Sequence, residues 1–527
     1  MKQLNQFQID SFKDGYDSYS NSKTLIKKTE VPVGQNTQPD DNGSFTKRAG
    51  MVAFGGEIVA GHVPTGFYEY KTDSKEELIV ACNDSWYRKN GASWTKLTGK
   101  TFTADKDTHF IQAMDRLYGC NGVDKLCYYD GTSVVEETVF GTASGIFSKI
   151  EYAYRRLWAA DTVVKGRVYY SNSTASDGTV GNLGTFDIAL SDTPVKNAGY
   201  YMPKPGSGME IVDLREDGGL LWIISKKWVE KVGPPGDQNT DNSVTFPITN
   251  ASSDLGGISP RGTVKTLNDF WMYSGENLYT NGEVAQYQSA RTTPKSGRIR
   301  SEISSVTVTG QPKVALGYFK EKIYFAYQMG SYNDHVIELD TRLNAWSTPF
   351  IGWNIGGFLD YNDAGTHRFL GMSSLDSYIY ELETGTDDNG SPIESFFETI
   401  STDCEKPGLV KRFGFIDVFY GMLYGVMTYE VFIDEVSSIT GSVQIGSSTS
   451  VPSGIGTQIM GTFMMGEEYD PNTTFSTLRQ NSSFRIDCEF NPGTRISVRF
   501  TNNNTGEQFK INGLVIYYQD GNIYETL

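Results

Sequence analysis

Apolar and polar residues alternate in a pattern that repeats along most of the chain. Seven times, a polar or charged turn is followed by two or three apolar residues, with a large aromatic in most of the segments. Consecutive segments lie 39, 40, 64, 49, 53 and 46 residues apart. Repeats of this period, each holding several short strands, predict a β-propeller. The central apolar residues of the seven segments are Leu78, Leu117, Leu157, Leu221, Phe270, Ile323 and Phe369.

The repeats between residues 61 and 385 predict seven blades, and one wide gap leaves six or eight open. This 64-residue gap contains a loop at 171–209 rich in Gly, Ser, Asp and Thr, and a second loop follows at 233–243. Both compositions are typical of surface loops. The large side chains of the repeats are expected to pack between neighbouring blades. The predicted blade-core residues are Leu117, Trp158, Trp222, Phe270, Trp271 and Tyr324.

The pattern changes at a polar hinge around residues 385–390, after which apolar and polar residues alternate one by one. Period two with one polar face predicts half-buried antiparallel strands. We therefore predict a separate C-terminal β-sandwich at 386–527, large enough to fold on its own. Residues 1–60 are predicted to form an arm leading into the first blade. The sandwich residues expected inside are Phe484, Ile486, Cys488, Phe490, Ile496, Val498 and Phe500, and those expected outside are Arg485, Asp487, Glu489, Arg495 and Arg499.

Composition supports an all-β class and restricts the partners. Aromatic residues make up 13% of the chain and there are 56 glycines, which favours strands joined by tight turns. The chain has no apolar run long enough to span a bilayer, and its start lacks the apolar stretch of a signal peptide, so we expect synthesis in a cytoplasm and no membrane insertion. The net charge is −17, and residues 386–527 hold 18 acidic and 8 basic residues, hence −10 of it. This argues against wrapping by nucleic acid, although an acidic wall would let DNA slide past without sticking.

The sequence offers little for catalysis or metal binding. The five cysteines form no Cys-x-x-Cys and the four histidines are scattered, which favours buried thiols over a metal site. Four pairs of adjacent carboxylates do not make acid/base dyads, because neighbours on a strand point to opposite faces. Signatures of a serine nucleophile, a zinc protease or a phosphate loop are missing from the sequence. We predict no enzyme activity, cofactor or metal. The carboxylate pairs are Asp40–Asp41, Glu136–Glu137, Asp387–Asp388 and Glu467–Glu468.

One stretch of the sequence bears on function as well as on fold. Residues 13–17 and 27–50 combine a Gly-Tyr step, an Asn-containing segment, a further glycine and a Lys-Arg-x-Gly run before the first repeat. This order resembles the opening of bacteriophage tail and neck proteins with a β-propeller core, including the tail nozzle and packaged-DNA-stabilising proteins of short-tailed phages. On physical grounds, Lys47 and Arg48 are expected to pin the arm to a blade carboxylate, and Gly50 to allow a tight turn. The residues that carry the resemblance are Gly15, Asn36, Gly43, Lys47, Arg48 and Gly50.

The resemblance implies a structural protein of the virion, placed in the tail or neck. It implies a homo-oligomeric ring, hexameric in that family, around the DNA path, which acts as a nozzle or hub in genome retention and ejection. Other tail or neck proteins would be its partners. A docking role is predicted for the sandwich.

A rival interpretation is a carbohydrate-binding or carbohydrate-active propeller that recognises a host receptor. The high aromatic content and the loops at 171–209 and 233–243 favour this interpretation. A generic interaction propeller is a third possibility. The aromatics that could stack on sugars are Trp86, Trp94, Trp353, Tyr200 and Tyr201, with packing between blades as the alternative.

Overall fold

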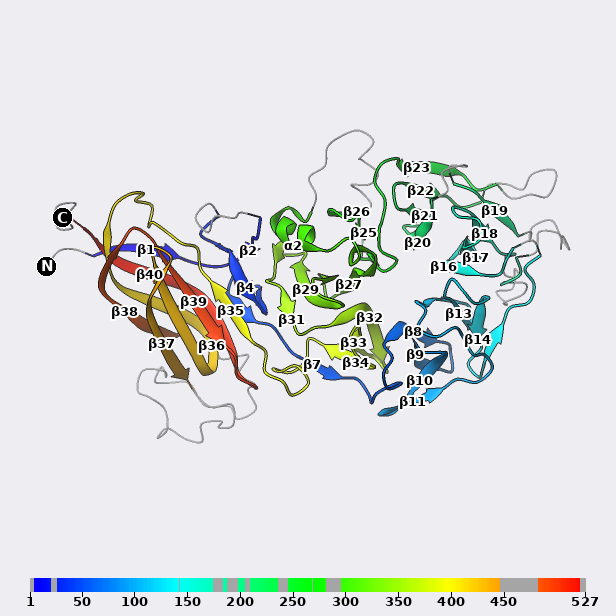
Figure 1. Cartoon of the computed structure of the whole chain (residues 1–527), viewed down its shortest axis with the longest axis horizontal. Coiled ribbons are helices and arrows are strands. Elements are labelled where there is room, and N and C mark those ends of the chain that lie inside the picture. The colour runs from blue at the N-terminus through cyan, green and yellow to red at the C-terminus, as the bar shows by residue number, and fades with distance from the viewer. Residues whose placement is uncertain are drawn as a thin grey trace.

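A computed structural model gives the arrangement of most of the chain in two β-rich bodies that lie side by side (Figure 1). One is a ring of small sheets and the other is a sandwich. The predicted all-β fold, a propeller followed by a C-terminal sandwich, is confirmed. The structure describes residues 4–19, 26–141, 143–173, 183–186, 198–203, 209–235, 245–267, 269–280, 295–445 and 482–521.

The ring contains seven sheets within the described residues, here called blades 1 to 7, all antiparallel except where β2 (Gly15–Tyr16) joins blade 6 in parallel. Blade 1 consists of β8 (Pro64–Lys71), β9 (Glu76–Cys82), β10 (Ser85–Asn90) and β11 (Ser93–Lys96). Blade 2 consists of β12 (His109–Ala113), β13 (Arg116–Cys120), β14 (Cys127–Tyr129) and β15 (Val134–Glu136). Blade 3 consists of β16 (Phe147–Ala153), β17 (Arg156–Asp161), β18 (Val168–Tyr170) and β19 (Gly199–Tyr201). Blade 4 consists of β20 (Ile211–Asp217), β21 (Leu220–Ser225), β22 (Val229–Val232) and β23 (Ile248–Ser252).

The remaining blades are less regular. Blade 5 has three described strands, β24 (Thr263–Lys265), β25 (Phe270–Tyr273) and β26 (Leu278–Thr280). Blade 6 consists of β27 (Ala315–Phe319), β28 (Lys322–Gln328), β29 (Asn333–Asp340) and β30 (Ala345–Trp346), extended by β2 (Gly15–Tyr16), β3 (Glu30–Val31) and β31 (Phe350–Ile351). Blade 7 consists of β32 (Ile355–Asp363), β33 (Thr366–Ser373), β34 (Ile379–Leu382) and β7 (Met51–Ala53). The short helices η1 (Gly297–Ile299), α2 (Arg300–Ser305) and η2 (Gln311–Lys313) connect blades 5 and 6.

Each sequence repeat corresponds to the second strand of one blade, from β9 in blade 1 to β33 in blade 7. The polar turn before the repeat is the hairpin that joins the first and second strands. In blade 6 the two turn residues, Lys320 and Glu321, have φ angles of 46° and 63°. Positive φ at both positions gives the turn whose twist matches the flanking strands. Large side chains close the gaps between blades: the Trp222 ring lies 4.8 Å from that of Phe270 in the next blade.

The ring closes through a strand from the other end of the propeller sequence. β7 pairs antiparallel with β34, so residues 51–53 complete the sheet that residues 355–382 begin. The first and last parts of the propeller sequence are thereby held together by backbone hydrogen bonds.

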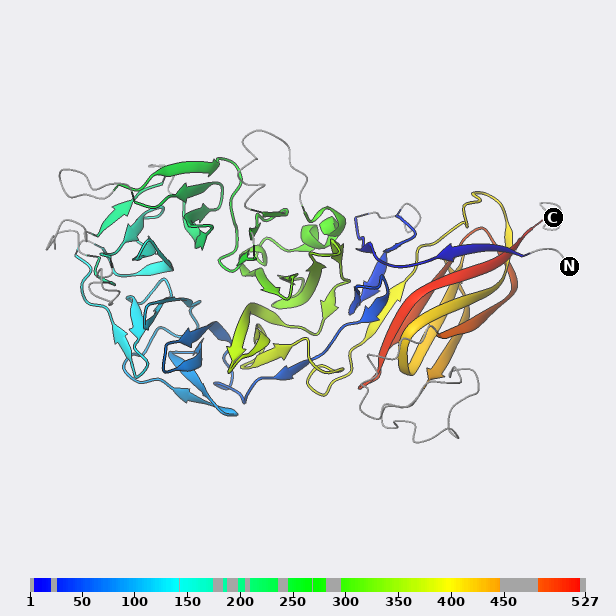
Figure 2. The same ribbon diagram turned by 180° about the vertical axis from the view of Figure 1, so that it is seen from behind.

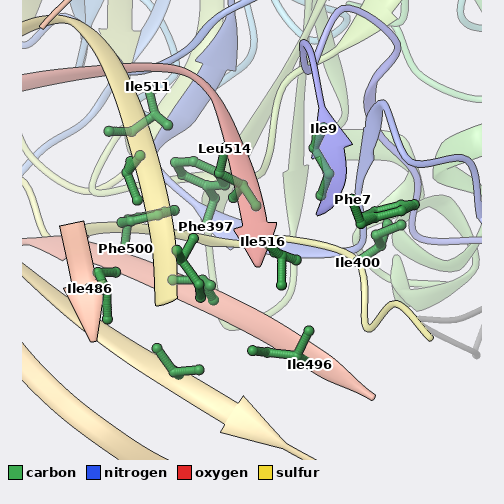
Figure 3. Close-up of a cluster of buried hydrophobic side chains, with 14 of the residues drawn as sticks. Phe7, Ile9, Phe397, Ile400, Ile486, Ile496, Phe500, Ile511, Leu514 and Ile516 are labelled. Atoms are coloured by element: carbon green, nitrogen blue, oxygen red, sulfur yellow. The ribbon is translucent and has the colours of Figure 1, made fainter. Parts of the chain in front are cut away.

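The sandwich is built around one long strand, β36 (Lys411–Ile433). Its first half pairs with β38 (Ser482–Gly493) and β40 (Gln508–Asp520), and its second half with β37 (Val436–Ile445) and β39 (Ile496–Asn502). The partners change near Gly425, whose φ is 103°. β35 (Ser395–Glu398) pairs with β39. Figure 3 shows apolar side chains from β1 (Asn5–Ile9), β35, β38, β39 and β40 meeting in one core.

The N-terminal segment differs from the predicted arm because most of its strands belong to the sandwich. β1 (Asn5–Ile9) and β6 (Phe45–Lys47) pair with β40, β4 (Val33–Gln35) pairs with β35, and β5 (Thr37–Pro39) pairs with β6. The start of β1 and the end of β40, which pair with each other, consequently lie at the end of the sandwich remote from the propeller (Figure 2). Residues 386–527 alone are therefore not the complete sandwich.

The alternation predicted for β38 holds only in part. Ile486 and Cys488 are buried, as are Ile496, Val498 and Phe500 on β39, whereas Phe484 is half-buried. Phe490 was expected inside and is 45% exposed. The reason is a bulge opposite Gly414, where Glu489 and Phe490 have φ angles of 53° and 57° and shift the side-chain order. All five cysteines are free and buried.

Candidate functional site at the junction of the two domains

Arg48 lies at the centre of the junction between propeller and sandwich and has no exposed side-chain surface. Its guanidinium donates to both carboxylate oxygens of Asp388, at 2.8 and 2.6 Å. The other three N–H groups donate to Asn36 Oδ1, Ala49 O and Ile351 O, each at 2.9 Å. The guanidinium also stacks 5.0 Å from the centre of the Trp353 ring. Every donor of this buried cation is satisfied, which is the condition for such a group to be stable in a protein interior.

The carboxylate that Arg48 contacts comes from the hinge rather than from a blade. Asp388 follows blade 7 and precedes β35, so the ion pair fixes the point where the chain leaves the propeller. Ile351 belongs to β31 of blade 6, so the same guanidinium also holds the propeller. Sequence reasoning anticipated a carboxylate partner but placed it in a blade, because the hinge was interpreted as a solvated turn.

The Asn36 side chain makes a second set of hydrogen bonds at the junction. Its amide nitrogen donates to Glu394 O at 2.7 Å, and its oxygen accepts from Ile351 N at 2.8 Å as well as from Arg48. Its φ is 55°, a left-handed conformation that asparagine tolerates better than most residues. Asn36 thus connects the start of β35 with blade 6.

The three predicted glycines lie where backbones approach closely or turn. A Cβ on Gly50 would lie 1.8 Å from Asp387 O, so only glycine fits there. Gly15 has a φ of 71°, and a Cβ would lie 2.5 Å from Trp346 O in blade 6. Gly43 has a φ of 76° in the turn between β5 and β6, beside Ser11.

Lys47, next to Arg48, faces the opposite way, into the sandwich. It is 2% exposed, and its ammonium donates to Asn502 Oδ1 at 2.7 Å and to Asn504 O at 3.2 Å. Burial lowers the pKa of Lys47 to about 8, against the opposing effect of Glu507. The expected blade carboxylate is not its hydrogen-bond partner: Lys47 is the last residue of β6 and its side chain binds within the sandwich, whereas Arg48 follows the strand and binds the hinge and blade 6.

The predicted blade-core residues are buried at blade boundaries. Leu117 packs with blade 1, Trp158 with blade 4 and Trp271 with blade 6. The Tyr324 ring lies 4.5 Å from Phe369 of blade 7, and Trp222 and Phe270 contact each other as described above. These residues hold the blades together and do not line a binding surface.

A second cluster of charged groups lies on the first strands of the blades, which surround the centre of the ring in Figure 1. Asp213 on β20 is fully buried and accepts from Arg215 Nη2 at 3.1 Å and from the Thr263 hydroxyl. Lys149 on β16 is 8% exposed, and its ammonium lies 3.5 Å from Pro260 O. Sequence reasoning missed this cluster, because a charged residue within a strand usually indicates a solvent face.

Two further groups of this central cluster titrate far from their usual range. Burial raises the pKa of Glu151 to about 7, although Arg215 lies near. Burial, together with the charge of Lys149, lowers the pKa of His109 to about 3. Glu151 is therefore largely protonated below neutral pH and His109 is neutral, as expected where water is scarce.

Arg261 connects blades on opposite sides of the ring. From the start of blade 5, its Nη2 donates to Thr65 O at 2.5 Å and to Asp107 Oδ1 at 3.0 Å, and its Nη1 donates to Gly356 O at 3.2 Å. The three acceptors belong to the segments that begin blades 1, 2 and 7. This side chain ties the centre of the ring together at one end.

The aromatics proposed for sugar stacking are mostly packed into the propeller. Trp86 and Trp353 are 2% and 1% exposed, so they cannot form a binding platform. The Trp94 indole donates to Gly56 O at 2.8 Å, and the Tyr201 hydroxyl donates to Glu230 at 2.7 Å. Tyr200 alone of the five is widely exposed, at 52%.

The adjacent carboxylates have separate partners where the structure describes them. Asp388 binds Arg48, Glu136 binds Lys100, and Asp41 pairs with Arg342. Glu467 and Glu468 lie outside the described residues. Within the described part of the chain, no three His, Cys, Asp or Glu side chains come close enough to hold a metal ion, and no helix is long and apolar enough to cross a membrane.

Comparisons with known proteins show distant likeness in fold and no family. No family model and no curated protein matches the sequence. Among solved structures, the extracellular domain of a one-component system from B. thetaiotaomicron is 11% identical, with a TM-score of 0.42, over 80% of this chain and 58% of its own. The extracellular domain of a hybrid two-component system from the same organism is 13% identical, with a TM-score of 0.38, over 64% of this chain and 41% of its own. YCF48 bound to D1 peptide is 9% identical, with a TM-score of 0.37, over 62% of this chain and 93% of its own.

Proposed function

We propose that this protein is a structural component of a bacteriophage tail or neck, assembled in several copies as a ring around the DNA path. The observation that carries the proposal is the junction. Asn36, Arg48 and Gly50, through which the chain resembles phage tail and neck propellers, form the contacts that fix the propeller to the sandwich. The residues that carry the resemblance are therefore the residues that join the two domains.

A rigid two-domain body suits a role in an assembly under mechanical load. The fully satisfied Arg48–Asp388 pair resists separation, because removing either partner leaves a buried charge. In this proposal the blades form the ring with neighbouring copies and the sandwich docks onto another tail protein. In this proposal the acidic excess of residues 386–527, which form most of the sandwich and hold 18 acidic against 8 basic residues, keeps DNA from adhering as it passes.

The test is an inventory of purified virions by mass spectrometry, together with imaging of the particles. We expect the protein in a ring at the tail or neck, and in solution a homo-oligomer by light scattering, sixfold if it follows the family. Its absence from purified virions would refute the proposal. Tight binding of the isolated chain to a glycan array would instead favour the receptor-recognition alternative, and hydrolysis of a glycan would contradict a non-enzymatic role.

A further inference from the structure

The environment of Lys47 contains the three groups needed for a covalent reaction between side chains. Asn502, at the end of β39, is 2% exposed and places its carboxamide against the Lys47 ammonium, with Nζ 2.7 Å from Oδ1. The other end of the same amide faces Glu507, with Nδ2 donating to Oε2 at 2.7 Å. A nucleophile, an electrophilic carbonyl carbon and a carboxylate are thus arranged in a row.

The orientation of the Asn502 amide is fixed by its neighbours. Nδ2 has two acceptors, Glu507 Oε2 and Val426 O, the latter at 2.8 Å. The opposite orientation would direct the oxygen at both acceptors and the NH₂ group at a lysine, so it is excluded on hydrogen-bonding grounds. Glu507 is held in turn, since its Oε2 also accepts from Val426 N and Asn504 Nδ2, each at 2.9 Å.

The surroundings favour an uncharged amine. Phe45, Phe500 and Phe509, which neighbour these residues in sequence, are fully buried in the sandwich core. Burial is the main cause that lowers the pKa of Lys47 to about 8, and Arg48 lowers it further, whereas Glu507, Asp388 and Asp387 raise it. A substantial fraction of the lysine is therefore a neutral nucleophile near pH 8.

We propose that Lys47 and Asn502 form an intramolecular amide bond, with Glu507 as the proton carrier. The Nζ lone pair attacks Cγ of Asn502, a C–N bond forms, and the Cγ–Nδ2 bond breaks. In the tetrahedral adduct both nitrogens are bonded to Cγ, and Glu507, which is hydrogen-bonded to Nδ2, takes one proton from the attacking nitrogen and delivers it to Nδ2, which leaves as ammonia. The carboxylate returns to its starting state, and no oxidant, metal or cofactor takes part.

Another buried lysine of the same domain provides an internal comparison. Lys411 is fully buried, and its ammonium donates to three backbone carbonyls, Lys406 O, Leu409 O and Thr494 O. Attack on a backbone carbonyl would cut the chain instead of releasing ammonia. Burial of a lysine is therefore common to both sites, and the carboxamide with its carboxylate is particular to Lys47.

The bond would join β6 to β39 and close a covalent loop from residue 47 to residue 502 that includes the whole propeller. It would lie next to Arg48, so a covalent tie to the sandwich would adjoin the ionic tie at the hinge. This inference does not depend on the proposed function, and it concerns the maturation of the chain itself.

The experiment is an intact-mass measurement of the purified full-length protein, followed by peptide mapping. We expect the protein to be lighter than its sequence by one ammonia molecule and to give one branched peptide joining Lys47 to Asn502. The variants Lys47→Arg, Asn502→Ala and Glu507→Gln should have their full calculated masses. Lys510→Arg, which removes a nearby lysine paired with Asp40, should still lose ammonia.

Several outcomes would overturn the inference. One is a wild-type protein of full mass after incubation at pH 8, with Lys47 and Asn502 in separate linear peptides. This result needs no variant to fold. Ammonia loss with Lys47 still in a linear peptide would also overturn it, because it would place the reaction elsewhere. Bond formation in folded Glu507→Gln, checked by circular dichroism, would remove the role assigned to Glu507.

Discussion

The propeller and the sandwich close in opposite ways. Five blades of the propeller are formed only by strands consecutive in sequence, whereas blade 6 is extended by β2 and β3 and blade 7 is completed by β7, all from the N-terminal segment. The sandwich instead combines β35–β40 with four strands from the first 47 residues. Local pairing makes the propeller a set of similar units, whereas the sandwich exists only when both ends of the chain are present. The two domains should therefore respond differently to the same kind of damage.

The largest expected effect is that of deleting residues 387–527. The deletion removes every sandwich partner of β1 and β4 and exposes Phe7, Ile9 and Phe45, which are now buried. We expect the product to aggregate, because it presents unpaired strands and apolar side chains. The measurement is the soluble fraction after expression, with thermal denaturation of what remains.

The matched control for this deletion is the fragment 50–386, which lacks the N-terminal sandwich strands as well. It keeps the seven blades including β7, except for β2 and β3 at the edge of blade 6, and we expect it to be soluble and to unfold cooperatively. Equal behaviour of the two truncated proteins would show that the N-terminal strands do not need the sandwich.

Within the propeller, Trp222→Ala should cost about 3–5 kcal/mol of unfolding free energy. Trp222 is 3% exposed and packs against Phe270 of the next blade, so truncation leaves a cavity at the boundary. Denaturant titration measures the loss. Tyr200→Ala, at a side chain that is 52% exposed, should change stability by less than about 0.5 kcal/mol. Similar costs for both would contradict the packing role of Trp222.

At the junction, Arg48→Ala should cost about 3–5 kcal/mol, because Asp388 would lose its partner inside the protein. We also expect the calorimetric unfolding of the two domains to separate into two transitions. The double variant Arg48→Ala/Asp388→Asn should recover part of the stability, since the stranded charge is gone. An unchanged single transition in Arg48→Ala would mean that other contacts couple the domains.

The centre of the propeller should give a pH dependence that Glu151 controls. Its folded pKa of about 7 lies above the unfolded value, so the folded state holds more protons between about pH 4.5 and 7. Stability contributed by this proton is present at low pH and is lost as pH rises through 7, by at most about 3 kcal/mol. Glu151→Gln should flatten this part of the profile, as measured by denaturant unfolding at each pH. A wild-type profile identical to that of the variant would contradict the shifted pKa.

The smallest effect should come from Phe490→Ser on β38, below about 0.5 kcal/mol, because this ring is already 45% exposed at the bulge. Ile486→Ala on the same strand should cost about 2–5 kcal/mol, because Ile486 is fully buried. Chemical denaturation of the pair tests the change in side-chain order. A larger loss for Phe490→Ser than for Ile486→Ala would contradict it.

These contrasts explain what the sequence could predict. The repeats were visible because each blade places the same kind of strand after the same kind of turn, and this relation spans a few residues. The pairing of β1 with β40 could not be inferred, because Phe7 and its partner Ile516 are separated by nearly the whole chain. Phe490 was misplaced because two left-handed residues interrupt a regular alternation, and the sequence carries no clear mark of a bulge there.

The sequence identified several residues of the candidate site but not the partners that they contact. Arg48 and Asn36 were selected from their place before the first repeat, but their partners Asp388 and Glu394 lie at the far end of the propeller sequence. Lys47 was assigned the same partner as Arg48, although Lys47 ends β6 and binds within the sandwich, whereas Arg48 follows the strand and binds at the junction. The central cluster of Asp213 and Lys149 was not anticipated, because only the ring brings those strands together.

The placement of β1 and β4–β6 also determines when these strands can join the sandwich during synthesis. These strands leave the ribosome before the blades, but apart from the pairing of β5 with β6 their earliest partner in the sandwich, β35, begins at Ser395. At about 5–20 residues per second, the nascent strands wait roughly 20–70 s while the blades emerge and fold beside them. During that interval Phe7, Ile9 and Phe45 have no core to enter, so the early chain is a natural client for a holding chaperone. β40 ends this wait by pairing with β1 and β6 along the edge that β36 leaves free.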